Sequence, residues 1–358
     1  MINEQVLKMA DDLFKNIPRE KIGFFPTPLH RLNNISKRYG AEVWIKRDDL
    51  TGPSIFGGNK TRKLEFLLGE AKQENRDYII TYGATQSNHA MQTSIACRKL
   101  GFNAVLYLVA VVPPDEKWPR GNLLLDRVMG AEVHIEPSSP GGADEARSRA
   151  RSAALARIRE LEEKGHRCYD VPSGGASPTG TLGYAEALLE LGRQVKQEAA
   201  LSGFDYVYQA AGSGGTLAGL LAGKELLQLD FELVPVDVGL VVPGFKEEIA
   251  ALAEQALTLL GAGGSIAPDS FVIEADFAGP GYEVPSLESS AALKTLARQE
   301  GILVGPVYTA KALAALLAHL ESGRIKKGSR VLFWHTGGAS ELFAEADIVG
   351  GDILTPDQ

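Results

Sequence analysis

The stretch Tyr206–Gly219 reads YVYQAAGSGGTLAG and contains the pattern that decides the fold. A run of mainly apolar residues, interrupted by Gln209, is followed by glycines and small hydroxyls, and then by the start of an apolar helix. Strands of a parallel sheet have such near-continuous runs, because helices cover both faces of the sheet. Glycines between a strand and a helix leave backbone N–H groups available to cradle a phosphate. The stretch therefore predicts a strand–turn–helix unit of an α/β protein with a phosphate site.

This turn matches neither of two common nucleotide-binding motifs. In the dinucleotide fingerprint G-x-G-x-x-G, Leu217 would take the place of the third glycine. A P-loop is excluded as well, since no Gly-Lys-Ser or Gly-Lys-Thr ends the turn. A small phosphate monoester therefore fits the turn better than a nucleotide.

Outward from this unit, short apolar runs alternate with amphipathic stretches such as Asn88–Leu100 and Asp144–Lys164. Repetition of strand, helix and strand predicts a doubly wound α/β architecture. Val111–Arg120 and Gly261–Pro268 are typical of loops, and Pro172–Gly183 is predicted to be a hinge or crossover loop. The predicted strands are Val43–Lys46, Tyr78–Tyr82, Ala104–Val109, Glu132–Glu136, Tyr206–Ala210, Leu233–Val238, Phe271–Glu274 and Arg330–Trp334.

The composition limits the class of protein. The length of 358 residues predicts two domains or one large one. The composition, with 44% hydrophobic and 23% charged residues, excludes an intrinsically disordered chain. A net charge of −8 disfavours nucleic acid as the main partner. No apolar run reaches the roughly 18 residues of a membrane span, and the charged N-terminal stretch does not resemble a signal peptide. Cys97 and Cys168 show no metal-site spacing, so we expect two buried thiols, no metal and a cytoplasmic location.

The stretch Gly57–Glu65, GGNKTRKLE, contains a candidate for covalent catalysis. Lys60 follows two glycines and Asn59, and glycines let the backbone approach a ligand closely. A lysine amine in such a turn can form a Schiff base with an aldehyde cofactor. Most lysines are solvated surface charges, so this pattern alone leaves a surface lysine as the alternative.

A second candidate site lies in Tyr82–Gln92, YGATQSNHAMQ, directly after a predicted strand. Ser87 and Asn88 open a helix, whose free N–H groups and dipole favour a carboxylate or a phosphate. The alternative is a plain helix cap. His89 faces either a ligand or its own helix, and both readings stay open here.

Further polar residues follow Gly- and Pro-containing turns late in the chain. Tyr282 lies in GPGYEVP and Tyr308 in GPVYT, and each is either a packing residue or an acid–base group. Thr336, in HTGG, follows a predicted strand, which is the usual place for ligand contacts in an open α/β sheet.

Taken together and in this order, these segments resemble the fold-type II, tryptophan-synthase-β-like pyridoxal-phosphate enzymes, in particular the D-cysteine desulfhydrase and 1-aminocyclopropane-1-carboxylate (ACC) deaminase family. The resemblance runs from about Pro26 to about Phe343 and includes GNLLLDRVMGAEV at Gly121–Val133. It implies two open, twisted, mainly parallel sheets flanked by helices. Residues 1–61 and 173–358 would form the larger cofactor domain, and 62–172 a smaller inserted α/β domain. It also implies a homodimer acting on a small amino acid.

The resemblance assigns the cofactor contacts. Lys60 would form the Schiff base with pyridoxal 5'-phosphate, Asn59 would hydrogen-bond the phenolic oxygen of the cofactor, and Thr336 would lie near its pyridine nitrogen. The phosphate would be cradled by Ser213, Gly214, Gly215, Thr216 and Leu217.

The substrate contacts follow from the same resemblance. Ser87, Asn88 and His89 would hold the substrate carboxylate at the helix N-terminus. Tyr282 and Tyr308 would face the substrate side of the cofactor ring, where either could act as an acid–base group. Together with Lys60 and Ser87, the two tyrosines form the predicted catalytic set.

One sequence position distinguishes the two branches of the family. ACC deaminases have Tyr-Glu where this chain has Tyr308 and Thr309, and a neutral hydroxyl leaves the ring nitrogen less protonated than a carboxylate would. This favours β-elimination from D-cysteine to pyruvate, ammonia and hydrogen sulfide. The competing functions are those of an L-cysteate sulfo-lyase, an ACC deaminase, a racemase or β-replacement enzyme, and a non-catalytic binding protein. The segment Pro53–Phe56 matches no branch.

Overall fold

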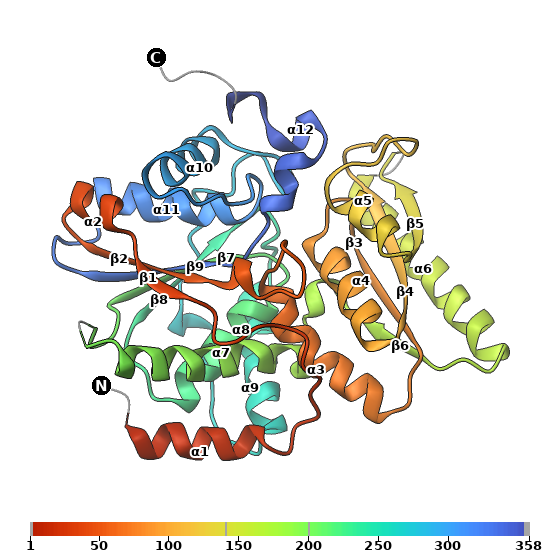
Figure 1. Ribbon diagram of the computed structural model, residues 1–358, viewed down its shortest axis with the longest axis horizontal. Coiled ribbons are helices and arrows are strands. Elements are labelled where there is room, and N and C mark those ends of the chain that lie inside the picture. The colour runs from red at the N-terminus through yellow and green to blue at the C-terminus, as the bar shows by residue number, and fades with distance from the viewer. Residues whose placement is uncertain (1–2, 140–141, 200, 354–358) are drawn as a thin grey trace.

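The computed structural model of the protein describes residues 3–139, 142–199 and 201–353. It contains two sheets with helices on both faces (Figure 1). The larger sheet has the strand order β1-β2-β9-β7-β8 and the smaller sheet β5-β4-β3-β6, and only β1 and β2 are antiparallel. The strands are β1 (Leu29–Arg31), β2 (Glu42–Arg47), β3 (Tyr78–Ala84), β4 (Asn103–Ala110), β5 (Glu132–Pro137), β6 (Cys168–Val171), β7 (Tyr206–Ala211), β8 (Glu232–Asp237) and β9 (Arg330–His335). The predicted α/β class with two mainly parallel sheets is confirmed.

Helices cover the sheets in layers (Figure 1). In the larger sheet, α7, α8 and α9 pack on one face and α10 and α11 on the other, each with its own apolar cluster. In the smaller sheet, α4 packs on one face and α6 on the other. The helices are α1 (Glu4–Phe14), α2 (Asn33–Tyr39), α3 (Asn59–Gln73), α4 (Asn88–Leu100), α5 (Gly121–Val128), α6 (Gly142–Glu163), α7 (Pro178–Gln197), α8 (Gly215–Leu226), α9 (Phe245–Leu259), α10 (Leu287–Glu300), α11 (Thr309–Glu321) and α12 (Ala346–Val349).

The smaller sheet is contributed by one stretch of sequence, because all its strands fall between Tyr78 and Val171. In the larger sheet, β2 and β9 come from opposite ends of the chain and pair in parallel. This arrangement is compatible with an inserted unit, but the boundaries at residues 62 and 172 stay a prediction. In the described part of the chain, no helix is long and apolar enough to cross a membrane.

Local sequence signals explain where the elements begin and end. Helix α4 begins at Asn88 because the Ser87 side chain caps it by accepting from Ala90 N, and it ends at Gly101, which has the left-handed φ of +83°. Seven of the eight predicted strands correspond to β2, β3, β4, β5, β7, β8 and β9. The strands β1 and β6 were not predicted, because both are short edge strands with half-exposed residues that give little apolar signal.

Two predictions were wrong. Phe271–Glu274 is not a strand: it makes a single bridge, between Glu274 and Val236, and Val272 is exposed. Pro172–Gly183 is a loop only over its first half, because α7 begins at Pro178 behind the capping Ser177. Proline is well suited to a first helical turn. A Cβ at Gly183 would lie 2.5 Å from Arg62 O, so this glycine allows α7 to pack closely on α3 and does not mark a turn.

A buried ionic cluster joins the larger sheet to α3 and α7. Arg62 of α3 donates to both Asp48 oxygens at 2.8 Å and to the two Glu190 oxygens at 3.0 and 2.9 Å. Asp48 also accepts from Tyr184 Oη at 2.7 Å and from Trp334 Nε1 at 2.8 Å, and its pKa lies well below the usual range because Arg62 outweighs the effect of burial. The cluster fixes the first turn of α3 against the sheet.

Replacing Asp48 by asparagine should be strongly destabilising, because it removes one of the two carboxylates that pair with Arg62 and leaves two buried cations, Arg62 and Lys46, to share Glu190. Breaking one partner of a buried pair costs roughly 3–5 kcal/mol of unfolding free energy, whereas Tyr184→Phe removes only one hydrogen bond and should cost about 1–2 kcal/mol. Urea unfolding measures both. The exposed Asp12, which pairs with Lys15, provides the control: Asp12→Asn should leave the unfolding free energy unchanged. Equal stability of Asp48→Asn and Asp12→Asn would show that the cluster does not hold the fold.

Candidate active site

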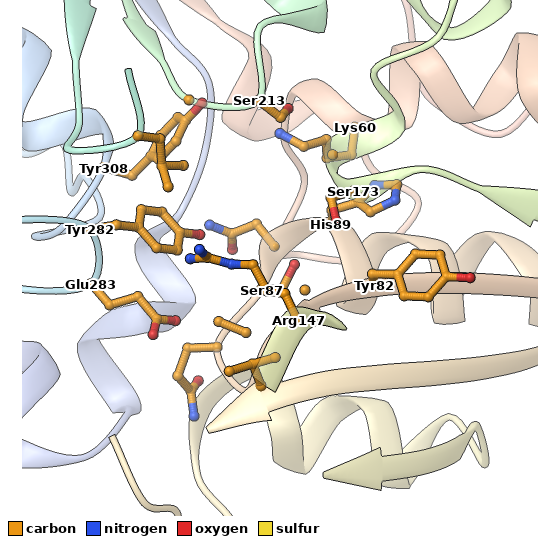
Figure 2. Close-up of a pocket in the computed structure, with 18 of the residues that line it drawn as sticks. Lys60, Tyr82, Ser87, His89, Arg147, Ser173, Ser213, Tyr282, Glu283 and Tyr308 are labelled. Carbon is orange, nitrogen blue, oxygen red and sulfur yellow. The ribbon is translucent and has the colours of Figure 1, made fainter. Parts of the chain in front are cut away.

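A cavity of about 740 Å³ lies between the two sheets. Its walls come from the carboxyl ends of β3, β7 and β9 and from the turns that follow them, which is where open α/β sheets bind ligands. Figure 2 shows Lys60, Ser87, His89, Ser213, Tyr282 and Tyr308 pointing into one space. No group of three His, Cys, Asp or Glu side chains in the described ranges could hold a metal ion.

Lys60 lies in the first turn of α3 and is almost fully buried. A Cβ at Gly58 would come within 2.4 Å of Gln92 Nε2, so only glycine lets this turn approach its neighbours closely. Lys60 Nζ donates to Asn59 Oδ1 at 2.9 Å, and Asn59 Nδ2 donates to Thr216 Oγ1 at 2.9 Å. Burial lowers the pKa of Lys60 to about 8, with Glu341 opposing the shift. A substantial fraction of the amine is therefore uncharged near neutral pH and can act as a nucleophile or a base.

The N-terminus of α8 forms an anion site beside this lysine. Gly214 has the left-handed φ of +84°, and no side chain caps the helix that begins at Gly215. The first N–H groups of the helix are thus left for a ligand. Lys63, one turn after Lys60, donates to Gly174 O at 3.0 Å, and its Nζ lies 3.0 Å from the position of a Cβ on Gly215. Lys63 was not predicted as a site residue, although the spacing of three residues in KTRK places both lysines on one helix face.

The N-terminus of α4 forms a second site for an anion. Ser87 Oγ accepts from Ala90 N at 3.2 Å, so the serine is a helix cap and also lines the cavity. The Asn88 side chain is fixed on both sides, since its Nδ2 donates to Glu341 Oε1 at 2.6 Å and its Oδ1 accepts from Asn122 Nδ2 at 3.0 Å. Backbone N–H groups, and not the Asn88 amide, are therefore the free donors for a carboxylate here.

His89 is a neutral acceptor that faces the cavity. Thr81 Oγ1 donates to Val171 O at 2.9 Å, so it must accept from His89 Nε2, which lies 2.8 Å away. Nδ1 then carries the free lone pair, and it is buried without a protein partner. Burial, together with Lys60 and Lys63, holds the pKa of His89 well below its usual value. An unpartnered buried acceptor calls for a hydrogen-bond donor from a bound molecule.

The two predicted tyrosines line the opposite wall. Tyr308 directly precedes α11, and Lys60 Nζ lies 5.8 Å from the centroid of its ring. Burial raises the pKa of both Tyr308 and Tyr282, so both hydroxyls keep their protons at neutral pH. Thr336 follows β9, and its Oγ1 lies 3.3 Å from Thr309 Oγ1, which in turn lies 2.7 Å from Gly337 O. In the described structure, neither threonine hydroxyl contacts a carboxylate.

Two glutamates in the cavity were not predicted from sequence. Glu341 follows HTGG, and burial raises its pKa to about 8 in spite of the hydrogen bond from Asn88. Glu283 follows Tyr282 in the left-handed region with φ +65°, and burial raises its pKa to about 7. Nothing in the sequence distinguishes either from a surface glutamate, because their burial depends on loops from distant parts of the chain.

The structure therefore gathers the predicted residues around one cavity. Lining it are Asn59, Lys60, Ser87, Asn88, His89, Ser213, Tyr282, Tyr308 and Thr336. Gly214, Gly215, Thr216 and Leu217 form the turn into α8 behind Ser213, and the Leu217 side chain packs in the apolar core. The role of each residue stays a prediction.

Comparisons with known proteins agree with this geometry. Residues 21–337 match the family described as "Pyridoxal-phosphate dependent enzyme". A putative ACC deaminase of Pyrococcus horikoshii is 38% identical over 94% of this chain and 96% of its own. A D-cysteine desulfhydrase of Klebsiella pneumoniae is 38% identical over 91% of this chain and 96% of its own.

Solved structures show the same fold. The crystal structure of an ACC deaminase homologue superimposes with a TM-score of 0.81 at 37% identity, and covers 93% of this chain and 96% of that one. A threonine deaminase from Solanum lycopersicum has a TM-score of 0.62 at 18% identity, covering 94% of this chain and 85% of that one, and so supports the fold alone. With a buried lysine facing an anion site, and relatives matched over nearly their whole length, the chain belongs to the pyridoxal-phosphate-dependent enzymes, in the group of ACC deaminases and D-cysteine desulfhydrases.

Proposed function

We propose that the protein catalyses β-elimination from a small sulfur-containing amino acid, with D-cysteine as the preferred substrate. The products are pyruvate, ammonia and hydrogen sulfide, formed with the uptake of one water. The observation that carries the choice within the group is the pair of hydroxyls at Thr309 and Thr336, where an acidic partner for the cofactor ring is expected in ACC deaminases. Neutral hydroxyls suit the expulsion of a good leaving group better than the opening of an unactivated cyclopropane.

The residues present fit pyridoxal 5'-phosphate. A buried amine without an ion-pair partner, an uncapped helix N-terminus and the neighbouring Lys63 meet at one end of the cavity. We infer that Lys60 holds the aldehyde carbon, and that α8 with Lys63 holds the phosphate. When bound, the cofactor supplies an aldehyde for the amines of lysine and substrate, and a ring that accepts the electron pair left on Cα.

Residues of the chain itself would bind the substrate and transfer the protons. The substrate carboxylate would rest on the N–H groups at the start of α4, where the helix dipole favours it. The uncharged Lys60 amine would take the proton from Cα. The protonated hydroxyl of Tyr308 or Tyr282 would give a proton to the departing sulfur. His89 Nδ1 would accept a hydrogen bond from the bound molecules.

ACC deamination is the second candidate, because the relatives from Pyrococcus have that name. Elimination of sulfite from L-cysteate, racemisation and β-replacement are further reactions that the same cofactor site could support.

We further propose a homodimer, in which the exposed Ile55 and Phe343, beside Phe56, would be covered by a second copy. The mass of the homodimer in light scattering would be twice that of the 38.3 kDa chain. Neither nucleic acid nor membrane is proposed as a partner. The free, buried Cys97 and Cys168 support a reducing compartment such as the cytoplasm.

A panel of substrates tests the proposed function. It comprises D-cysteine, L-cysteine, L-cysteate, D-serine, β-chloro-D-alanine and ACC, with the 2-oxo acid, ammonia and sulfide measured for each. D-Cysteine should give the highest kcat/KM, with the three products in equal amounts. A higher kcat/KM for ACC would assign the protein to the other branch, and racemised substrate without 2-oxo acid would refute elimination.

The Lys60→Ala variant tests the role of the lysine. Because the covalent route and the base are lost together, activity should fall by more than the roughly 100- to 10,000-fold that acid–base help contributes alone. The absorption band of the lysine-bound cofactor should also disappear. The matched control is Lys72→Ala on the exposed face of the same helix, which should keep both band and activity. Near-normal turnover by Lys60→Ala would remove the basis of the proposal.

A further inference from the structure

One wall of the cavity has acidic groups whose hydrogen-bonding capacity is not used. Glu283 Oε2, Glu341 Oε2 and Glu345 Oε1 are buried and have no hydrogen-bond partner. Glu283 and Glu341 are each only 3% exposed, and both line the cavity. Figure 2 shows the Glu283 carboxyl group directed into the cavity below Tyr282, at the far end of the view from Lys60. A buried carboxyl oxygen without a donor is unfavourable, so these groups point to a ligand.

Apart from Lys60, which is assigned above to the cofactor, the cations near these two glutamates have other partners. Arg147 pairs with Asp144 on its own helix, and Arg151 pairs with Asp170 at 2.5 Å. Lys311 Nζ donates to three backbone carbonyls, those of Val238, Ala278 and Gly281. Throughout the described residues, no Lys or Arg forms an ion pair with Glu283 or Glu341. Arg147 lines the cavity and opposes the rise in the Glu283 pKa without forming an ion pair with it, so both carboxyl groups retain oxygens that a bound cation can contact.

The pKa values of both carboxyl groups are raised, as expected for buried acids that have no ion-pair partner. Burial raises the pKa of Glu283 to about 7, where Glu345 adds to the rise and Arg147 opposes it. Burial also raises the pKa of Glu341 to about 8, and the charge of Glu283 contributes. A metal ion does not explain the arrangement, because no set of three suitable side chains in the described ranges surrounds one point. An organic ammonium group with several N–H donors would satisfy both carboxyls.

We propose that Glu283 and Glu341 bind an ammonium group at the end of a longer β-substituent, so that cysteine derivatives with an aminothiol leaving group are substrates alongside D-cysteine. This inference rests on the proposed β-elimination and specifies its substrate class. The cavity of about 740 Å³ falls in the range of roughly 300–1,000 Å³ that holds drug-sized ligands, and the cofactor together with a cysteine derivative is a ligand of that size. The substituent extends from the reacting carbon near Lys60 toward Glu283.

S-(2-Aminoethyl)-cysteine represents this class, and its reaction is balanced. The proton on Cα moves to the Lys60 amine, and the Cβ–S bond breaks with its electron pair on sulfur. The thiolate takes up a proton and leaves as 2-aminoethanethiol. One water then completes the conversion of the remaining three-carbon unit to pyruvate and ammonia. No oxidant or reductant is needed.

The test compares two probes of opposite charge, S-(2-aminoethyl)-cysteine and S-carboxymethyl-cysteine, each in both enantiomers. Pyruvate formation by the holoenzyme gives KM and kcat/KM for a probe that is turned over, and calorimetry gives Kd for a probe that is not. The amine probe should be favoured roughly 10- to 100-fold, as expected for charge-assisted hydrogen bonds to buried carboxylates. Glu283→Gln and Glu341→Gln should each reduce the preference about tenfold, mainly through KM. Glu288→Gln, on the exposed first turn of α10, is the control and should leave the preference unchanged.

The pH dependence provides a second readout. Glu283 faces Arg147 from α6, and Glu345, Glu341 and Tyr282 from the neighbouring loops. Between pH 6 and 8 the carboxyl group loses its proton while the amine of the probe stays charged. Binding of S-(2-aminoethyl)-cysteine should therefore tighten over this range in the wild type, and clearly less in Glu283→Gln.

The possible failures can be told apart. Equal or tighter binding of the carboxymethyl probe overturns the inference, as does a preference for the amine that survives both Gln variants. If the amine probe binds selectively but neither it nor D-cysteine yields pyruvate, β-elimination fails as the proposed function and the ammonium site stands. If D-cysteine is turned over but the two probes do not differ, only the ammonium site is refuted.

Discussion

The contact between the Arg62 guanidinium and the Asp48 carboxylate is the constraint on which the site depends. Arg62 lies two residues after Lys60 in α3, and the two hydrogen bonds to Asp48, both 2.8 Å long, leave the helix no freedom to rotate. A buried ion pair contributes little net stability over an apolar alternative, but it fixes a geometry, because every unpartnered arrangement is costly. The pair thus sets the direction in which the Lys60 side chain projects from α3.

Burial of the side chains around the cavity determines its electrostatics. Low polarity lowers the pKa of Lys60, Lys63 and His89 and raises that of Glu283 and Glu341, so each shift favours the neutral form. Lysine–amine exchange and proton abstraction need an uncharged amine, and two helix N-termini supply positive potential without titratable groups. The site combines side chains whose neutral forms are favoured by burial with fixed backbone dipoles, an arrangement suited to anionic phosphate and carboxylate groups and to a reactive lysine.

The sequence predicted what is encoded locally. Continuous apolar runs placed seven strands, and the boundaries of α4 were predictable because Ser87 and Gly101 are strong cap residues. Lys60, Ser87 and Thr336 could be singled out because each follows a turn or a strand end. Phe271–Glu274 was misassigned because apolar content alone does not supply a pairing partner.

Other features depend on tertiary packing. The glycines of Pro172–Gly183 suggested a loop, but Gly183 serves the packing of α7 on α3. Glu283 and Glu341 resemble surface glutamates until distant loops bury them, and the Asp48 cluster unites four separate segments of the chain. Their chemistry arises from neighbours that no local pattern reveals.

The central claim is that one of two adjacent buried lysines, Lys60, binds the cofactor covalently while Lys63 supports its phosphate. Borohydride reduction of the purified holoenzyme, followed by peptide mass spectrometry, tests this directly, since reduction makes the bond to the lysine permanent. The account predicts a pyridoxyl group on Lys60 and an unmodified Lys63. Modification at Lys63 or at a surface lysine, with Lys60 unmodified, would contradict it.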